Sequence, residues 1–243
     1  RLVTSESAEE VDFYLTKSPH CSSSLAPDQK ALEPWAFSSL FEVDNIVKLP
    51  SVDLQSALLK ADVDYIDGYK TDSQGTDLRI FNSLPKEIIN KILLAEFEPG
   101  IIDAYQGEDK LHNLLAHMEK EPFWISNMEI KGSQRINNLD LKSLNYFQQR
   151  SIESFLKMAP GWCEISYLNK MEQSEMTLRE YLLAWVFASL NAENGFALFV
   201  ANKGYELFGD KLLLKLQNKS IKELSSGYFH LSFKLLKRIA RLK

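Results

Sequence analysis

Cysteine and histidine are the side chains in this sequence that could supply a nucleophile and its base. Cys163 stands in the segment PGWCEISY, where a helix could begin and lower the pKa of the thiol. A catalytic thiolate also needs a base within hydrogen-bond reach, and a fold would have to bring a distant histidine to Cys163. The distant histidines are His112, His117 and His230. A cysteine-dependent hydrolase or deamidase is therefore one alternative function, beside a buried structural cysteine.

Metal and nucleotide chemistry find less support in the spacing of residues. His112 and His117 are five positions apart, whereas one face of a helix presents ligands three or four positions apart. The Gly-Lys-Ser/Thr phosphate loop and the Gly-x-Gly-x-x-Gly dinucleotide motif are both absent from the sequence. We therefore expect no metal site and no cofactor.

The C-terminal segment combines an apolar stripe with basic residues. From Lys211 onward, nine Lys and Arg residues face the single acid Glu223, a net charge of +8 that leaves −13 for residues 1–210. In GYFHLSFKLLKRIARLK, helical spacing places the basic residues opposite the apolar stripe; they include Lys234, Lys237, Arg238 and Arg241. Such a helix can rest on an anionic membrane or on a partner protein, or pack on its own domain. Because the rest of the chain is acidic and would repel phosphate, we expect no nucleic-acid partner.

The stretch FNSLPKEIINKILLAEFEPG, which begins at Phe81, has the signals of a helix that starts well. Pro85 suits a first helical position, and Glu87 suits the positive end of the helix. At 100° per residue the apolar residues cover about half of the circumference, which is wider than the roughly 100° stripe of a surface helix. The pattern therefore fits either a core helix or a helix that docks on a partner.

The same stretch resembles the opening of an F-box, a short three-helix module. The match consists of Leu84, Pro85, Glu87 and Ile88, with Ile92-Leu93 further on and Phe123-Trp124 near the expected end of the module. The middle of the F-box pattern has no clear equivalent here, and the resemblance covers about a fifth of the chain. It implies that residues near 82–126 bind a Skp-family adaptor and that the remaining body binds a target protein for ubiquitin transfer. Leu84, Pro85, Ile88, Ile92 and Trp124 are the residues on which this binding would depend.

The composition indicates an ordinary folded chain. The 243 residues are 45% hydrophobic, 11% aromatic and 25% charged, which is typical of globular domains. Two cysteines in a chain of this length argue against a disulfide framework and favour a reducing, cytoplasmic location, which would be the host cytosol for a secreted effector. Residues 181–192 form the longest strongly apolar run, and as a helix they would span ~18 Å of the ~30 Å bilayer core.

Repeated helical spacing and capping boxes at Thr177/Glu180 and Ser220/Glu223 predict an all-α, multi-helical fold. The sequence suggests an N-terminal helical region with an acidic linker (1–77), an F-box-like segment (78–128) and a C-terminal helical domain with the basic tail (129–243). The function predicted first is a protein-interaction adaptor that recruits a target to a Skp–cullin ubiquitin ligase. The alternatives are the enzyme built on Cys163 and a membrane-surface protein that binds through its basic tail.

Overall fold

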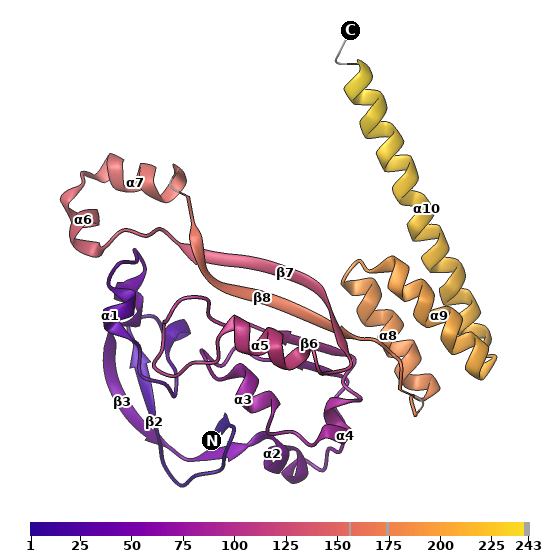
Figure 1. Cartoon of the computed structure of the whole chain (residues 1–243), viewed down its shortest axis with the longest axis horizontal. Coiled ribbons are helices and arrows are strands. Elements are labelled where there is room, and N and C mark those ends of the chain that lie inside the picture. Colours follow the sequence, from indigo (N-terminus) through magenta and orange to yellow (C-terminus); the bar gives the residue numbers. More distant parts are fainter. Residues whose placement is uncertain (156, 174, 241–243) are drawn as a thin grey trace. The chain divides into compact units, whose positions relative to one another are not determined.

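The chain folds into two compact units, residues 1–167 and 168–243 (Figure 1). The computed structural model describes residues 1–155, 157–173 and 175–240, without the side chains of residues 153, 154 and 226–240. Helices make up 42% of the structure and strands 24%. The prediction of an all-α fold is therefore wrong, and the protein is a mixed α/β protein.

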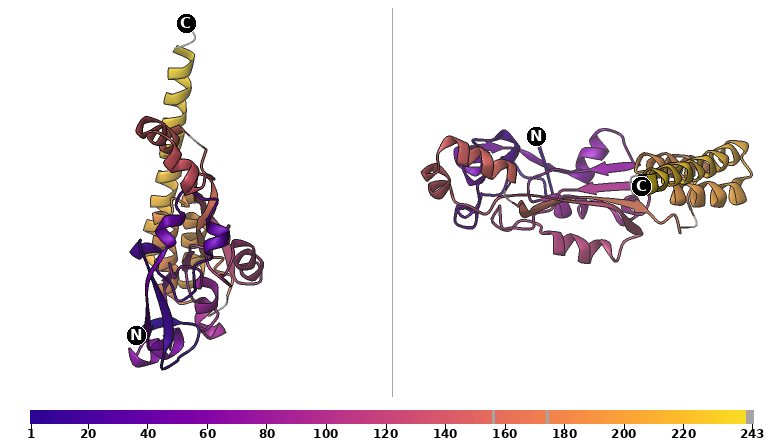
Figure 2. Two further views of the ribbon diagram at one scale, coloured as in Figure 1. Left: turned by 90° about the vertical axis from the view of Figure 1, so that its left-hand side faces the viewer. Right: turned by 90° about the horizontal axis from the view of Figure 1, so that it is seen from above.

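A four-stranded sheet organises the first unit, in the order β5-β6-β8-β7. Its strands are β5 (Gly68–Lys70), β6 (Leu94–Phe97), β7 (Phe123–Ser133) and β8 (Ala159–Asn169). β5 and β6 are parallel, and the helices α3 (Asp77–Phe81) and α4 (Lys86–Ile89) lie between them in sequence. α5 (Leu111–Met118) connects β6 to β7 and lies along one side of the strands (Figures 1 and 2).

β8 runs antiparallel to both of its neighbours. Gly132 of β7 lies against Gly161, and Ser126 donates a hydrogen bond to the carbonyl of Ser166, so the two strands run in opposite directions. On the other side, Gly100 forms an antiparallel bridge with Trp162. The helices α6 (Asn138–Ser143) and α7 (Tyr146–Phe155) lie at the end of the β7–β8 hairpin (Figure 1).

One face of this sheet forms the main hydrophobic core. Alternate residues of β8, namely Cys163, Ile165 and Tyr167, are buried together with Phe97 and Phe123. The residues between them, Trp162, Glu164 and Ser166, are only half-buried on the opposite face. This alternation is the period-2 signal of a strand with one covered face, which the prediction of helices overlooked.

The F-box-like stretch forms a much shorter helix than expected. α4 has four residues, Pro85 occupies its N-cap position, and the chain leaves the helix after Ile89. Ile92 lies beyond the helix, and the apolar run that follows it becomes β6. A short apolar run fits a buried strand as well as a buried helix, and here pairing with β5 and β8 decides between them.

The N-terminal part of the first unit contains two small sheets. β2 (Val11–Thr16) pairs antiparallel with β3 (Val43–Leu49), and β1 (Leu2–Thr4) pairs parallel with β4 (Ser51–Asp53). The short helices η1 (Pro19–Cys21), α1 (Gln29–Leu32) and η2 (Ser38–Phe41) lie between β2 and β3, and α2 (Leu54–Lys60) follows β4. Cys21, Leu32, Phe41 and Tyr105 form a second core cluster in this part.

The second unit contains the helices α8 (Leu178–Leu190), α9 (Asn194–Phe208) and α10 (Lys211–Ala240). The predicted capping box of Thr177 and Glu180 begins α8 and is confirmed. The capping box predicted at Ser220 is wrong, because this residue lies inside α10 and accepts a hydrogen bond from the Trp185 indole at 2.8 Å. Gly204 lets α9 approach its neighbours closely, since a Cβ there would lie 3.0 Å from side-chain atoms of both Tyr181 and Leu213.

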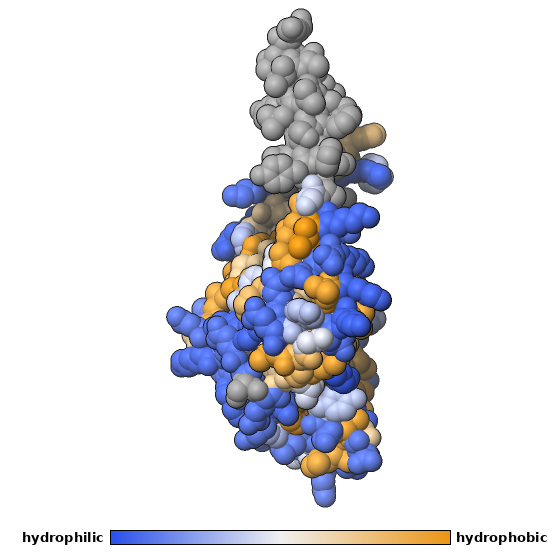
Figure 3. Space-filling view, turned by 90° about the vertical axis from the view of Figure 1, so that its right-hand side faces the viewer, coloured by the Kyte–Doolittle hydropathy of each residue, from blue (hydrophilic) through white to orange (hydrophobic). Residues whose placement is uncertain are grey.

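Exposed apolar side chains occur on these helices, for example Leu190 and Leu207. On the surface shown in Figure 3, hydrophobic residues (orange) are interspersed with hydrophilic ones (blue). Within the part of the chain that the structure describes, no helix is long and apolar enough to cross a membrane.

Candidate functional site

A cavity of about 400 Å³ opens at the carboxyl ends of the parallel strands β5 and β6. Asp72 follows β5 by two residues, and Glu98 comes directly after β6. Open α/β sheets generally bind ligands in this place, because the loops that follow parallel strands meet at the same edge. The cavity is therefore the leading candidate site of the first unit.

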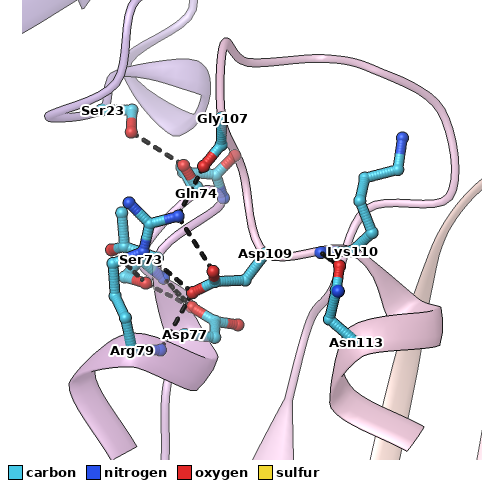
Figure 4. Close-up of polar contacts among 10 residues, drawn as sticks. Ser23, Ser73, Gln74, Asp77, Arg79, Gly107, Asp109, Lys110 and Asn113 are labelled. Carbon is cyan, nitrogen blue, oxygen red and sulfur yellow. Dashed lines mark hydrogen bonds and ion pairs between the residues drawn. The ribbon is translucent and has the colours of Figure 1, made fainter. Parts of the chain in front are cut away.

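The carboxylate of Asp77 fixes the loop that carries Asp72. Asp77 is 3% exposed and accepts hydrogen bonds from the Ser73 backbone N–H at 2.8 Å and from the Thr71 hydroxyl at 3.2 Å. Its second oxygen accepts from the Glu98 backbone N–H at 2.9 Å. Figure 4 shows the contact of Asp77 with Ser73. One buried carboxylate thus joins the loop after β5, which carries Asp72, to the end of β6, which carries Glu98.

An ion pair between Arg79 and Asp109 fixes the loop that contains Glu108. The Arg79 guanidinium donates to both oxygens of Asp109, from Nε at 3.1 Å and from Nη2 at 2.9 Å, and the Arg79 backbone N–H donates to the same carboxylate. Arg79 also donates to the carbonyl of Gly107 (Figure 4). This bidentate contact from α3 holds the loop that contains Glu108.

The N-terminal part of the chain supplies the remaining wall. The hydroxyl of Tyr105 contacts the carbonyl of Cys21 and the side-chain oxygen of Gln74, both at 2.9 Å. Ser23 donates to the backbone carbonyl of Gln74 at 2.7 Å (Figure 4). Gln74 and Gly75 both have positive φ angles, 55° and 99°, so the loop turns sharply at the cavity. Segments distant in sequence therefore build one pocket.

Three carboxyl groups of the pocket have pKa values above their ordinary range. Burial is the main cause for Asp72, Glu98 and Glu108. The negative charge of Asp72 raises the pKa of Glu98 further, and Lys70 opposes this effect. Lys110 lies 3.6 Å from Glu108 and partly balances its charge. Among the described residues, no hydrogen bond or ion pair to the Glu98 carboxylate is found, so this group faces the cavity without a cation of its own.

Aromatic rings form the apolar part of the cavity wall. The Phe37 ring centroid lies 5.2 Å from that of Phe41 and 6.3 Å from that of Trp162. Phe41 in turn contacts Tyr105, with 5.6 Å between the centroids. These rings combine a low-polarity surface with the negative potential of their π faces. The wall of the pocket therefore contains carboxylates and aromatic rings together.

The residues expected to bind a Skp adaptor lie mainly in or against the core. Leu84 is 5% exposed and Ile92 is fully buried, and both belong to the core cluster of the sheet. Ile88 packs against that cluster, and Pro85 and Trp124 are half-buried. The side chains of Leu84 and Ile92 are not available to a partner in this conformation, and the F-box-like resemblance stays a prediction.

Cys163 lies in the middle of β8 with a fully buried side chain. Burial, with a smaller effect of Glu164, raises the pKa of its thiol to about 11, which is the opposite of what a nucleophile needs. His112 is exposed on α5, and His117 lies on the same helix beside Glu121. The side chain of His230 lies outside the described residues. This arrangement lends no support to a nucleophilic Cys163.

The basic residues of the C-terminal tail cannot be placed in the same way. Lys234, Lys237 and Arg238 belong to α10, but their side chains lie outside the described part of the structure, as does the whole of Arg241. Among the described residues, no group of three or more His, Cys, Asp or Glu side chains is arranged to hold a metal ion.

No protein-family model, no curated protein and no solved structure matches this chain. The pocket carboxylates were not among the sites predicted from sequence, because the segment that contains Asp72 was interpreted as a linker and the stretch that contains Glu98 as F-box-like. The signal that could have found them is the position of Asp72 and Glu98 within two residues of the ends of two short strands.

Proposed function

We propose that the protein binds a small organic cation in the pocket at the ends of β5 and β6. The observation that carries this proposal is the placement of the half-buried Glu98 and the more exposed Asp72, two negatively charged groups, beside a wall of aromatic rings. The negative charge of Asp72 raises the cost of ionising Glu98, and a bound cation would offset that cost. The faces of the rings add a favourable cation–π interaction.

The class of ligand follows from this combination. Quaternary ammonium, methylated amine and sulfonium groups carry a diffuse positive charge that favours carboxylates and aromatic faces together. A hydrated metal ion would make little use of the rings. The position of the pocket at the carboxyl ends of parallel strands also suits a nucleoside, and an adenosyl sulfonium such as S-adenosylmethionine unites both features.

A sulfonium ligand would give the site a specific chemistry. A methyl group bonded to the positive sulfur can pass to a hydroxyl or amine of a second substrate, which leaves a neutral thioether. A carboxylate such as Glu98 can accept the proton that the acceptor loses. Methyl transfer is therefore the reaction we propose if the sulfonium proves to be the preferred cation.

The test compares pairs of ligands of similar shape, of which one member is positively charged at the relevant atom and the other is neutral there. Calorimetry would measure choline against its neutral isostere 3,3-dimethylbutan-1-ol, and S-adenosylmethionine against the thioether S-adenosylhomocysteine. We expect the charged member of at least one pair to bind about tenfold more tightly or better, from a cation–π and carboxylate contribution of ~1–2 kcal/mol. Equal or weaker binding of the charged member in both pairs would refute the proposal.

A matched pair of variants locates the site. Glu98→Gln keeps the shape of the side chain and removes its charge, so it is expected to abolish the preference for the charged ligand. Glu129→Gln makes the same change at an exposed position of β7 and should leave binding unchanged. Loss of the preference in both variants, or in neither, would place the cation elsewhere.

The adaptor function remains a separate proposal, supported by the F-box-like residues alone. Its test is the binding of the full chain to a purified Skp adaptor, beside a Leu84→Ala, Pro85→Ala double variant. Micromolar binding that is lost in a variant which still folds would support the adaptor. Because Leu84 is buried, we expect the double variant to melt at a lower temperature whether or not the adaptor binds.

A further inference from the structure

The two edges of the four-stranded sheet differ greatly in length. β5 forms one edge with three residues, whereas β7 forms the other with eleven. Strands in globular proteins usually have five or six residues. Among the described strands, only β8 pairs with β7, so one row of backbone N–H and C=O groups along β7 has no strand beside it. Long edges of this kind are templates for a further strand.

The side chains of β7 are unusually apolar for an open edge. Met128 and Ile130 are 39% and 48% exposed, and their spacing of two residues places them on the same face of the sheet. Ile125 is 42% exposed on the other face. Edge strands normally avoid such residues because they invite pairing with another chain.

The charges on this edge are arranged symmetrically about Ile130. Glu129 precedes it and Lys131 follows it, and within the chain the Lys131 ammonium lies 2.7 Å from the Glu129 carboxylate. In an antiparallel strand pair centred on Ile130, each Glu129 stands opposite the Lys131 of the other copy. The sequence is thus self-complementary in charge about this one residue.

We propose that a second copy of this chain pairs with β7 in antiparallel register about a two-fold axis through Ile130. The two Ile130 side chains meet at the centre, and each Met128 stands opposite the small Gly132 of its partner strand. Two Glu129–Lys131 pairs between the chains lie on the opposite face of the sheet. The contact is isologous, as in most homodimers, and it joins the two sheets into one of eight strands. It does not depend on the ligand of the pocket.

Charge exchange at this edge tests the register itself. In Glu129→Lys, lysines stand opposite lysines across the two-fold axis, and in Lys131→Glu, carboxylates stand opposite carboxylates. Sedimentation equilibrium of the full chain should show a concentration-dependent dimer, and each single variant should weaken it by about tenfold or more, since opposed like charges replace attractive pairs at two places. An equimolar mixture of the two single variants should recover the dimer, because the mixed pair restores attraction at both places.

The double variant Glu129→Lys, Lys131→Glu is the control for folding. It keeps both charges on each strand and should dimerise as the parent does, and near-ultraviolet circular dichroism checks that every variant is folded. A parent chain that stays monomeric up to several hundred micromolar overturns the proposal. So does a dimer that the single variants leave unchanged, or one that neither the mixture nor the double variant restores.

Discussion

Replacing Asp77 by alanine should lower the free energy of unfolding more than the removal of an exposed carboxylate would. The substitution leaves the backbone N–H groups of Ser73 and Glu98 without their acceptor, at positions where the bonds measure 2.8 and 2.9 Å. A hydrogen bond to a charged group contributes ~1.5–3 kcal/mol. Because Ser73 and Glu98 are half-buried and water can partly replace the carboxylate, we take the lower value for each. The free energy of unfolding should then fall by about 3 kcal/mol.

Thermal unfolding followed by near-ultraviolet circular dichroism measures this effect. For a unit of this size, a loss of about 3 kcal/mol corresponds to a melting temperature lower by about 6–12 °C. Asp77→Asn keeps one acceptor oxygen, so it should cost about half as much. Asp64→Ala removes an exposed carboxylate from the neighbouring loop and should stay within ~0.5 kcal/mol of the parent. If Asp77→Ala melted like Asp64→Ala, the claim that this carboxylate holds the pocket together would be refuted.

Three further predictions concern the same unit. Burial raises the pKa of Glu98, so this carboxyl group holds its proton more tightly in the folded protein than in the unfolded chain, and its ionisation at neutral pH costs stability. Glu98→Gln should therefore raise the melting temperature at pH 7. This gain should disappear as the pH falls through the raised pKa towards 4.5. A Cβ on Gly132 would lie 1.8 Å from the Ala159 carbonyl oxygen, whereas a Cβ on Gly195 would meet nothing within 4 Å. In urea unfolding, Gly132→Ala should therefore destabilise the protein by ~1–3 kcal/mol or more, and Gly195→Ala should not destabilise it. The buried Cys163 thiol should react with an aromatic disulfide reagent only as fast as the protein unfolds, and rapid reaction in the native state at pH 8 would contradict its placement in the core.

Local signals in the sequence were reliable where neighbouring residues supply the whole interaction. The box of Thr177 and Glu180 starts α8 as expected, because its hydrogen bonds join groups three residues apart. The same kind of pattern at Ser220 failed, because α10 continues through it and the Ser220 hydroxyl binds Trp185 instead. A capping pattern therefore identifies the start of a helix only where the preceding residues are not already helical.

The strands were missed for a related reason. Cys163, Ile165 and Tyr167 alternate with Trp162, Glu164 and Ser166, which is a strand pattern, but Pro160-Gly161 before it was interpreted as a possible start of a helix. The apolar run before β6 continues a helical pattern, so its spacing fits both structures. The position of this run between two other strands determined that it forms a strand. The sequence of a single stretch does not show which other strands it will pair with.

The sequence by itself was sufficient to predict a folded chain, helices in its C-terminal part and the charge contrast between its body and its tail. Only the tertiary structure decided the sheet, the pocket and the state of each ionisable group. Asp72 and Glu98 are 26 positions apart in the sequence, and they become neighbours because β5 and β6 lie side by side and end at the same edge. Burial raises the pKa of both groups, and the charge of Asp72 raises the pKa of Glu98 further; both effects are properties of the folded arrangement.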